Sequence, residues 1–119
     1  DVLYGMWSRP VAGVMGPFLT TMDELAEYVL PDGRLNIPLQ ILVNDVVRNR
    51  FNMRDVDYAM GDVVAHAASS GLLAAGSVFS SGTLCTLNNQ DGAWLVPGDE
   101  VTLDAGPLGT LTWQMEEWP

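Results

Sequence analysis

The side chains able to do chemistry are few in this 119-residue chain, and they lie in separate segments. His66 is the only histidine, and Asp62 precedes it by four residues, so a helix would place both side chains on one face. A histidine oriented by a carboxylate can act as a general base. The alternative is a surface or half-buried histidine with a local carboxylate partner, and the sequence leaves both interpretations open.

A second candidate segment surrounds Gly82-Thr83, which follows two serines and precedes Cys85. A tight turn of this composition offers N–H groups and hydroxyls that can hold a carboxylate or an oxyanion. The segment lacks the spacing of a phosphate loop or a dinucleotide-binding motif, so a purely structural turn is the alternative. Cys85 is the only cysteine. It is either a nucleophile or a small packed residue, and it cannot form an internal disulfide.

Clusters of oxygen ligands for a hard cation could come from three acidic pairs: Asp55 with Asp57, Asp99 with Glu100, and Glu116 with Glu117. None of these pairs has the spacing of a self-contained metal loop. The sequence therefore assigns no metal ligand, and solvated surface acids are the alternative interpretation.

The charge balance excludes several classes of partner. Fifteen acids stand against five arginines and no lysine, which gives a formal net charge of −10. Such a chain repels phosphate backbones and anionic membrane surfaces, so we expect neither nucleic acid nor membrane as a partner. No apolar run of about 18 residues is present to span a bilayer. The single cysteine and the absence of a signal-peptide pattern favour the cytoplasm.

Alternating apolar residues indicate the strands that must position these groups. Residues 35–43 alternate with period two, which predicts a strand with one buried face, and Pro38 indicates an edge or a bulge. Asn44-Asp45 has turn chemistry, and residues 46–51 are predicted to return as the second strand of a hairpin. Residues 108–115 alternate again and predict a terminal strand.

The apolar period becomes helical farther along, which predicts one main helix at about 55–70 that ends near Gly71. A shorter helix over about 22–29 is predicted from the capping pattern Thr21-x-x-Glu24. The runs 73–83 and 95–110 both place a glycine three residues after a leucine, and each is predicted to lead into a strand. The sum is a single α+β domain over residues 1–119, with four to six strands in a mainly antiparallel sheet.

Read in order, several short motifs resemble the C-terminal half of the fumarylacetoacetate hydrolase family. Each is a weak signal alone, but their order and spacing match from about residue 15 to 114. They are Met15-Gly16-Pro17-Phe18, Leu35-x-Ile37-x-Leu39, Val43-Asn44, Leu73-x-x-Gly76, Gly82-Thr83, Leu95-x-x-Gly98-Asp99-x-Val101 and Leu108-Gly109-Thr110-Leu111.

The resemblance implies a mixed β-sandwich or roll that is usually dimeric. It implies hydrolysis or decarboxylation of a carbon–carbon bond in a small acidic diketone or oxo acid. The cofactor implied is a divalent metal, typically magnesium, held by carboxylates. The family's Gly-Thr contacts substrate, and carried over to this chain that pair is Gly82 and Thr83.

Departures from the family pattern concern the catalytic groups. The family's Glu-x-Glu metal pair and its catalytic His-Glu lie upstream of the part that this chain resembles, and Asp1 is not assigned as a ligand. The family's lysine has no counterpart; Arg9 is the nearest cation and a candidate substrate contact, although arginine does not replace a catalytic lysine. Asp45 and Ser77 stand where the family often has Gly and Asp.

Two functional hypotheses follow from the resemblance. In the first, the chain is the C-terminal portion of a larger catalytic domain, or one chain of a complex. Metal ligands then come from a missing segment or from another chain, and the expected assembly is a homodimer or a pair with a complementing chain. In the alternative, it is a divergent, non-catalytic family member that acts as a binding or assembly subunit.

Overall fold

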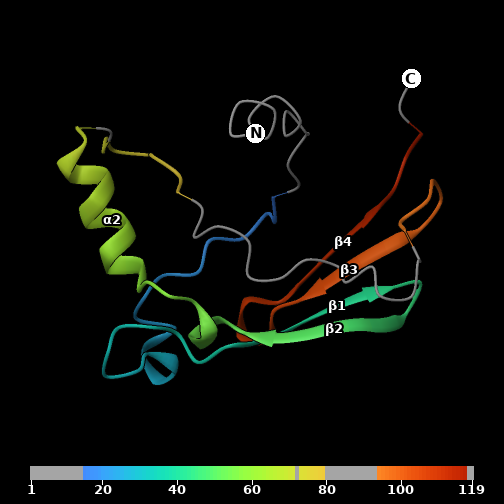
Figure 1. Ribbon diagram of the computed structural model, residues 1–119, viewed down its shortest axis with the longest axis horizontal. Coiled ribbons are helices and arrows are strands. Elements are labelled where there is room, and N and C mark those ends of the chain that lie inside the picture. Colours follow the sequence, from blue (N-terminus) through green and yellow to red (C-terminus); the bar gives the residue numbers. More distant parts are fainter. Residues whose placement is uncertain (1–14, 72, 80–93, 118–119) are drawn as a thin grey trace.

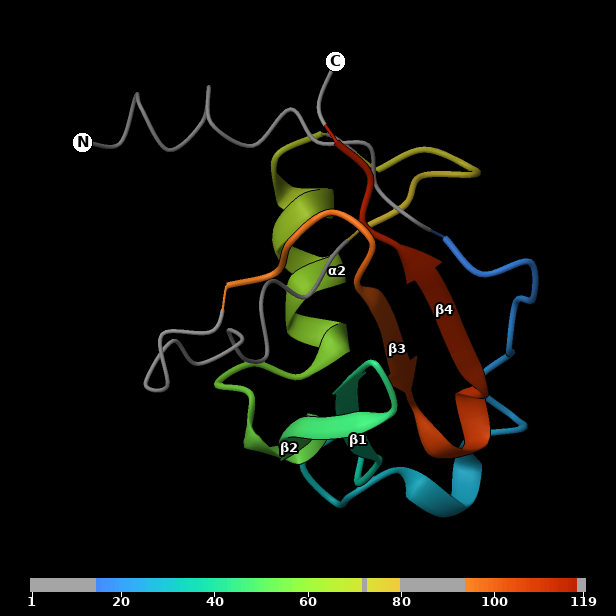
Figure 2. The same cartoon turned by 90° about the vertical axis from the view of Figure 1, so that its right-hand side faces the viewer.

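The computed structural model describes residues 15–71, 73–79 and 94–117. Four strands within these residues form one antiparallel sheet in the spatial order β2-β1-β3-β4 (Figure 1, Figure 2). The strands are β1 (Pro38–Val43), β2 (Val46–Asn52), β3 (Glu100–Asp104) and β4 (Thr110–Gln114). The prediction of an α+β chain with an antiparallel sheet is confirmed. The described residues build this sheet as a single open layer, and they contribute no second layer of a sandwich.

The β1–β2 hairpin forms where the sequence predicts it. Asn44 and Asp45 both have positive φ, 50° and 63°, the combination that a two-residue hairpin turn needs to match the strand twist. The register shifts between Ile41 and Leu42, which marks a bulge. Strand β1 begins at Pro38, three residues later than predicted, because a proline at the first strand position removes no ladder hydrogen bond.

Alternation along the strands separates the sheet into two faces. Leu39, Val43 and Val101 lie on one face and are buried, Val101 to 1% exposure. The opposite face carries polar side chains: Gln40 donates to Asp104 at 2.8 Å, and the hydroxyls of Thr102 and Thr112 lie 2.8 Å apart. The period-two pattern of the sequence thus predicts which face is apolar.

The helix α2 spans Met60–Ser69, so the predicted helix of about 55–70 starts five residues too early. Two local contacts explain the difference. The Asn52 side chain accepts from the N–H of Arg54 and begins a short 3₁₀ helix (Met53–Asp55) instead. Asp62 then accepts from the N–H of Ala59 at 3.0 Å and caps α2 itself.

Gly71, with φ of 67°, follows the end of α2 as predicted. Ala67 is the only buried side chain described on the helix, and Figure 1 shows α2 standing to one side of the sheet. Among the described residues, no helix is long and apolar enough to cross a membrane.

The predicted helix over about 22–29 is wrong in kind. Turns lead into a single 3₁₀ turn (Ala26–Tyr28), and no side chain caps it. Leu25 and Leu35 pack with the fully buried Ile37 in a small apolar cluster. The isolated bridge between Val29 and Leu35 draws the segment toward that cluster, and the burial of Leu25 there outweighs the capping pattern at Thr21.

Candidate functional site

The sequence candidates fall into two groups. The first group lies outside the described residues and comprises Arg9, Gly82, Thr83 and Cys85. His66 lies on α2 and is exposed. It lines a hollow of about 440 Å³ with Tyr58, Asp62 and Val63, so the predicted shared face with Asp62 is confirmed.

The carboxylate of Asp62 has a structural role at this site. Its Oδ2 atom accepts from the N–H of Ala59, which holds the first turn of α2. The contact satisfies a backbone donor that the start of a helix would otherwise leave unpaired. The described geometry therefore supports a helix cap at Asp62 in preference to an orienting partner for His66.

The two Leu-x-x-Gly runs make the same turn. In the first, Ser77 N–H donates to the carbonyl of Ala74, and the Ser77 hydroxyl accepts from Ala74 N–H, both at 3.0 Å. In the second, Asp99 N–H donates to Val96 O at 3.1 Å, and Asp99 Oδ2 accepts from Val96 N–H at 2.9 Å.

The glycine of each turn has positive φ, 84° at Gly76 and 95° at Gly98. A side chain is strained in that conformation, which is why the glycine recurs at the same position of both runs. The prediction of turns at these runs is confirmed. The strand predicted to follow the first run falls outside the described residues.

The second turn is tied to the β1–β2 hairpin through Asn44. Its side-chain amide donates to Asp99 Oδ1 at 2.8 Å, and its side-chain oxygen accepts from Glu100 N–H at 2.9 Å. The N–H of Asn44 donates to Glu100 O at 2.9 Å. Three hydrogen bonds thus join the hairpin turn to the start of β3, and motifs 55 residues apart in the sequence form one unit.

These contacts act on the ionisation of Asp99. The hydrogen bond from Val96 N–H, followed by that from the Asn44 amide, lowers the pKa of Asp99 below its ordinary value of 3.8. The carboxylate is therefore charged at neutral pH and acts as a double acceptor that fixes the turn. No general acid is expected at this position.

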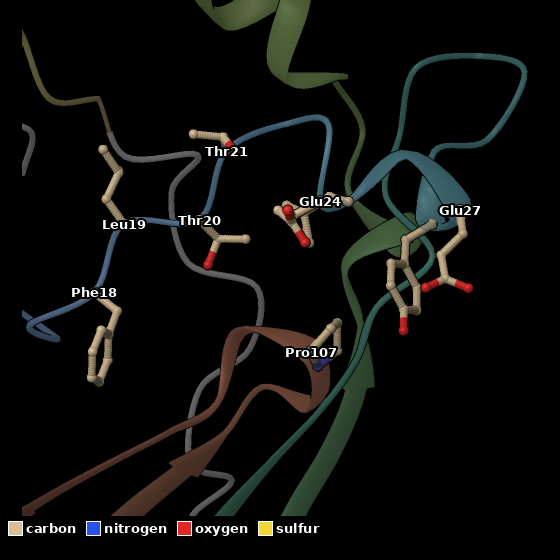
Figure 3. A pocket seen from close by; sticks show the side chains of 9 residues that line it. Phe18, Leu19, Thr20, Thr21, Glu24, Glu27 and Pro107 are labelled. Atoms are coloured by element: carbon tan, nitrogen blue, oxygen red, sulfur yellow. The ribbon is translucent and has the colours of Figure 1, made fainter.

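A larger hollow of about 470 Å³ opens beside the segment that follows the Gly-Pro motif (Figure 3). Glu24 and Glu27 lie on one side of it, with Pro107 below them in this view. The hydroxyl of Thr21 lowers the pKa of the neighbouring Asp23. The full lining of this hollow is Phe18, Leu19, Thr20, Thr21, Glu24, Leu25, Glu27, Tyr28 and Pro107. Two carboxylates and no cation would repel an acidic oxo acid, so this hollow is a poor site for such a substrate.

A third hollow, of about 300 Å³, lies on the polar side of the sheet, and the cationic residue Arg50 is part of its lining. Gln40 pairs with Arg50 on one side and with Asp104 on the other, so the three residues form a row across β2, β1 and β3. Gln40 Nε2 donates to Asp104 Oδ2, which orients the amide. Sequence reasoning did not single out Arg50, because cross-strand register is what places it beside Gln40.

The magnesium implied by the family resemblance finds no ligand set in the described part of the chain. No group of three or more His, Cys, Asp or Glu side chains comes together there. The acidic pairs noted in the sequence lie apart: Asp99 is committed to Val96 and Asn44, and Asp55 lies 3.7 Å from Arg54. The described residues do not fit the metal on their own.

The described residues form an α+β arrangement: a four-stranded antiparallel sheet, one main helix, and a glycine turn that precedes β3. Residues 7–116 match the family model of the fumarylacetoacetate (FAA) hydrolase C-terminal domain. This match covers most of the 119 residues, and the chain therefore belongs to that family. The resemblance drawn from the ordered motifs is confirmed. No curated protein and no solved structure matches the chain significantly.

Proposed function

We propose that this chain is part of a metal-dependent enzyme that hydrolyses or decarboxylates a carbon–carbon bond in a small acidic diketone or oxo acid. The observation that carries the proposal is the family match over residues 7–116. Metal ligands are supplied by a segment or a partner chain beyond the described residues. A lone cysteine, Cys85, fits a cytoplasmic enzyme.

The contribution of this chain is substrate binding. Gly82 offers a backbone N–H and Thr83 a hydroxyl, two donors that suit a substrate carboxylate or an oxyanion. The turn at Gly76-Ser77 precedes them by five residues in the sequence. Arg9 is proposed as a second contact for the acidic group of the substrate.

The hydrolytic reaction balances with water as the only co-reactant. The water oxygen adds to a carbonyl carbon of the diketone, and the bond from that carbon to its neighbour breaks. The departing carbon takes up a proton. One carboxylic acid and one ketone result, and groups that hold the substrate oxygens stabilise the charge that develops on them.

Replacement of Thr83 by alanine tests the proposed contact. We expect Thr83→Ala to weaken binding of oxalate, a dicarboxylate probe measured by calorimetry with MgCl₂ present, by about tenfold, because a charge-assisted hydrogen bond is lost. Melting temperature should change little. Thr83→Ser keeps the hydroxyl and is the matched control. A large fall in melting temperature with unchanged oxalate binding would assign Gly82-Thr83 to the fold alone.

The gene tests where the metal ligands come from. The encoded protein should extend upstream of the described sequence with a Glu-x-Glu pair, or a second chain should co-purify and carry one. Magnesium-dependent loss of diketone absorbance is then expected from the complete protein. A complete product of 119 residues that copurifies with no second chain and no magnesium would contradict the proposal and support a binding or assembly subunit.

A further inference from the structure

The chain passes from β2 into α2 through a bend of residues 53–59 (Figure 1). The bend begins with the 3₁₀ helix and continues as irregular backbone up to the first residue of α2. Arg34, which comes from an earlier segment, contacts it: Nη1 donates to the carbonyl of Arg54 at 2.8 Å and to the carbonyl of Val56 at 3.3 Å. One guanidinium nitrogen thus bonds the backbone on both sides of the point where the 3₁₀ helix ends.

Asp32 orients the guanidinium of Arg34. Asp32 Oδ2 accepts from Arg34 Nε at 2.8 Å and lies 2.6 Å from Nη2, while Oδ1 accepts from the backbone N–H of Arg34 at 3.0 Å. The hydrogen bond from the Arg34 side chain lowers the pKa of Asp32 below its ordinary value of 3.8, so the ion pair is complete at neutral pH. Because a guanidinium is a planar fork, a carboxylate on one edge leaves the other edge free to bond carbonyls.

Arg34 itself belongs to a small hairpin of residues 28–36. The bridge between Val29 and Leu35 joins its two sides, and the N–H of Asn36 donates to the carbonyl of Tyr28 at 2.7 Å. Leu35 is 7% exposed and packs in the apolar cluster. Arg34 therefore projects from a segment that backbone pairing and burial both hold.

The tip of this hairpin also lies against the start of α2. A Cβ placed on Gly33 would lie 3.5 Å from the Cβ of Ala59, an ordinary van der Waals contact. Asp62 accepts from the N–H of Ala59, so this contact is made with the capped end of the helix. The hollow between the two segments measures about 10 Å³, which is about the minimum for one water molecule. It is lined by Arg34, Leu35, Met53, Val56, Tyr58, Ala59 and Met60.

We propose that Arg34 is a latch that holds the bend, and through it the first turn of α2, against the 28–36 hairpin. When the latch is released, the bend and the first turn of α2 open while the strands stay paired. Strands β1, β2 and β3 keep their own ladder hydrogen bonds and buried side chains, so this opening is a local one. The inference concerns the conformation of the chain and does not depend on the proposed reaction.

Hydrogen exchange on the full chain tests the latch at three amides of the helix start. The N–H groups of Ala59, Asp62 and Val63 are hydrogen bonded there, and they exchange when the turn opens. We expect Arg34→Gln to speed their exchange by about tenfold, because charge-assisted hydrogen bonds are lost, and to leave the amides of β1 and β3 nearly unchanged. Arg50→Gln removes the same charge from β2 and is the matched control. Unchanged exchange at the three amides, or an equal rise in β1 and β3, would overturn the proposal.

Two milder variants apply the same test while keeping most of the structure. Asp32→Asn removes the charge that orients the guanidinium, and Arg34→Lys keeps the charge but loses the fork. Both should speed exchange at the helix start by a smaller factor than Arg34→Gln, again without a change in the strands. Wild-type exchange in both variants would contradict a latch made by the ion pair and its fork.

An engineered disulfide provides a rescue. In a Cys85→Ser background, Gly33→Cys with Ala59→Cys should form a disulfide, because the two Cβ positions lie at a suitable separation. With Arg34→Gln added, the oxidised form should show slow exchange at the helix start, and reduction should restore the fast exchange. Strain at residue 33, where φ is 80°, is common to both forms. Failure of the disulfide to form, or equal exchange in the oxidised and reduced forms, would refute the latch.

Discussion

Asp99 belongs to the turn of the second Leu-x-x-Gly run, and its side chain also contacts a residue far away in the sequence. One oxygen accepts from Val96 N–H inside its own turn, and the other accepts from Asn44 across the sheet. Asn44 has the positive φ that the hairpin turn demands, so its side chain leaves the turn pointing toward β3. Asn44 therefore has two roles: it forms the hairpin turn, and its side chain holds the start of β3.

We expect Asp99 to make the stability of this protein depend on pH. Its folded-state pKa lies below the unfolded value near 3.8, so the unfolded chain binds the proton more tightly. The stabilisation is fully present above about pH 4 and is lost as pH falls through the folded pKa. Asp99→Asn should lower the unfolding free energy at pH 7 and reduce its decline in acid, measured by urea unfolding from pH 7 to pH 2.

A charge-matched substitution controls for the loss of one acid. Asp45→Asn changes the net charge equally but leaves both acceptors of Asp99 in place. We expect Asp45→Asn to retain the acid dependence of the wild type. Equal pH profiles for the two variants would show that the contacts of Asp99 do not set it.

The two glycine turns are the elements that repeat. Each has a donor and an acceptor on the residue that follows glycine, Ser77 in one and Asp99 in the other. Among the described residues, hydrogen bonds from other segments reach only the second turn, through Asn44 and through the bonds of Gly98 and Asp99 to Met115. Within that part of the chain, the same local motif therefore has more external contacts before β3 than after α2.

Glycine replacement measures this difference in restraint. A Cβ at Gly98 or Gly76 meets no atom within 4 Å, so the cost of alanine is conformational. We expect Gly98→Ala to lower the unfolding free energy by about 1–2 kcal/mol, and Gly76→Ala by less, because its turn can relax. Gly16→Ala, at an equally open position without positive φ, should be nearly neutral in urea unfolding. A larger loss at Gly76 would contradict this ranking.

At the scale of the whole fold, the described residues leave much apolar surface exposed. Among the described residues, eight hydrophobic side chains are buried, while Phe18 is 89% exposed and Leu19 is 92% exposed. Helix α2 contributes one buried side chain, Ala67. Exposed apolar surface of this kind marks contacts with other segments or chains. It supports the proposal that a further segment or chain completes the site.

The net charge of the chain determines how its stability depends on salt concentration. Fifteen acids on a small chain repel one another, and that repulsion destabilises the compact state. We expect the melting temperature to rise when NaCl increases from about 20 to about 500 mM, because the Debye length shortens several-fold. A double variant, Asp55→Asn with Asp57→Asn, should show a smaller rise. A melting temperature that falls with salt would mean that ion pairs outweigh the repulsion.

The sequence alone determined what depends on neighbours in the chain. Asn44-Asp45 predicted the hairpin, Gly71 the end of α2, and the glycines of the two runs their turns, because backbone φ at such positions is a local requirement. Period-two alternation predicted the apolar face of the sheet. The ordered motifs predicted the family, since they report several such turns at once.

Only the tertiary structure decided what depends on contacts between distant segments. It placed Arg50 beside Gln40 by strand register. It replaced the helix predicted at 22–29 with turns, because burial of Leu25 against Ile37 outweighed a capping pattern. Strand order placed β4 last in the sheet that the described residues form, and its sequence alone did not reveal that position. Register and edges are properties of the assembled sheet, in which each strand's neighbours come from elsewhere in the chain.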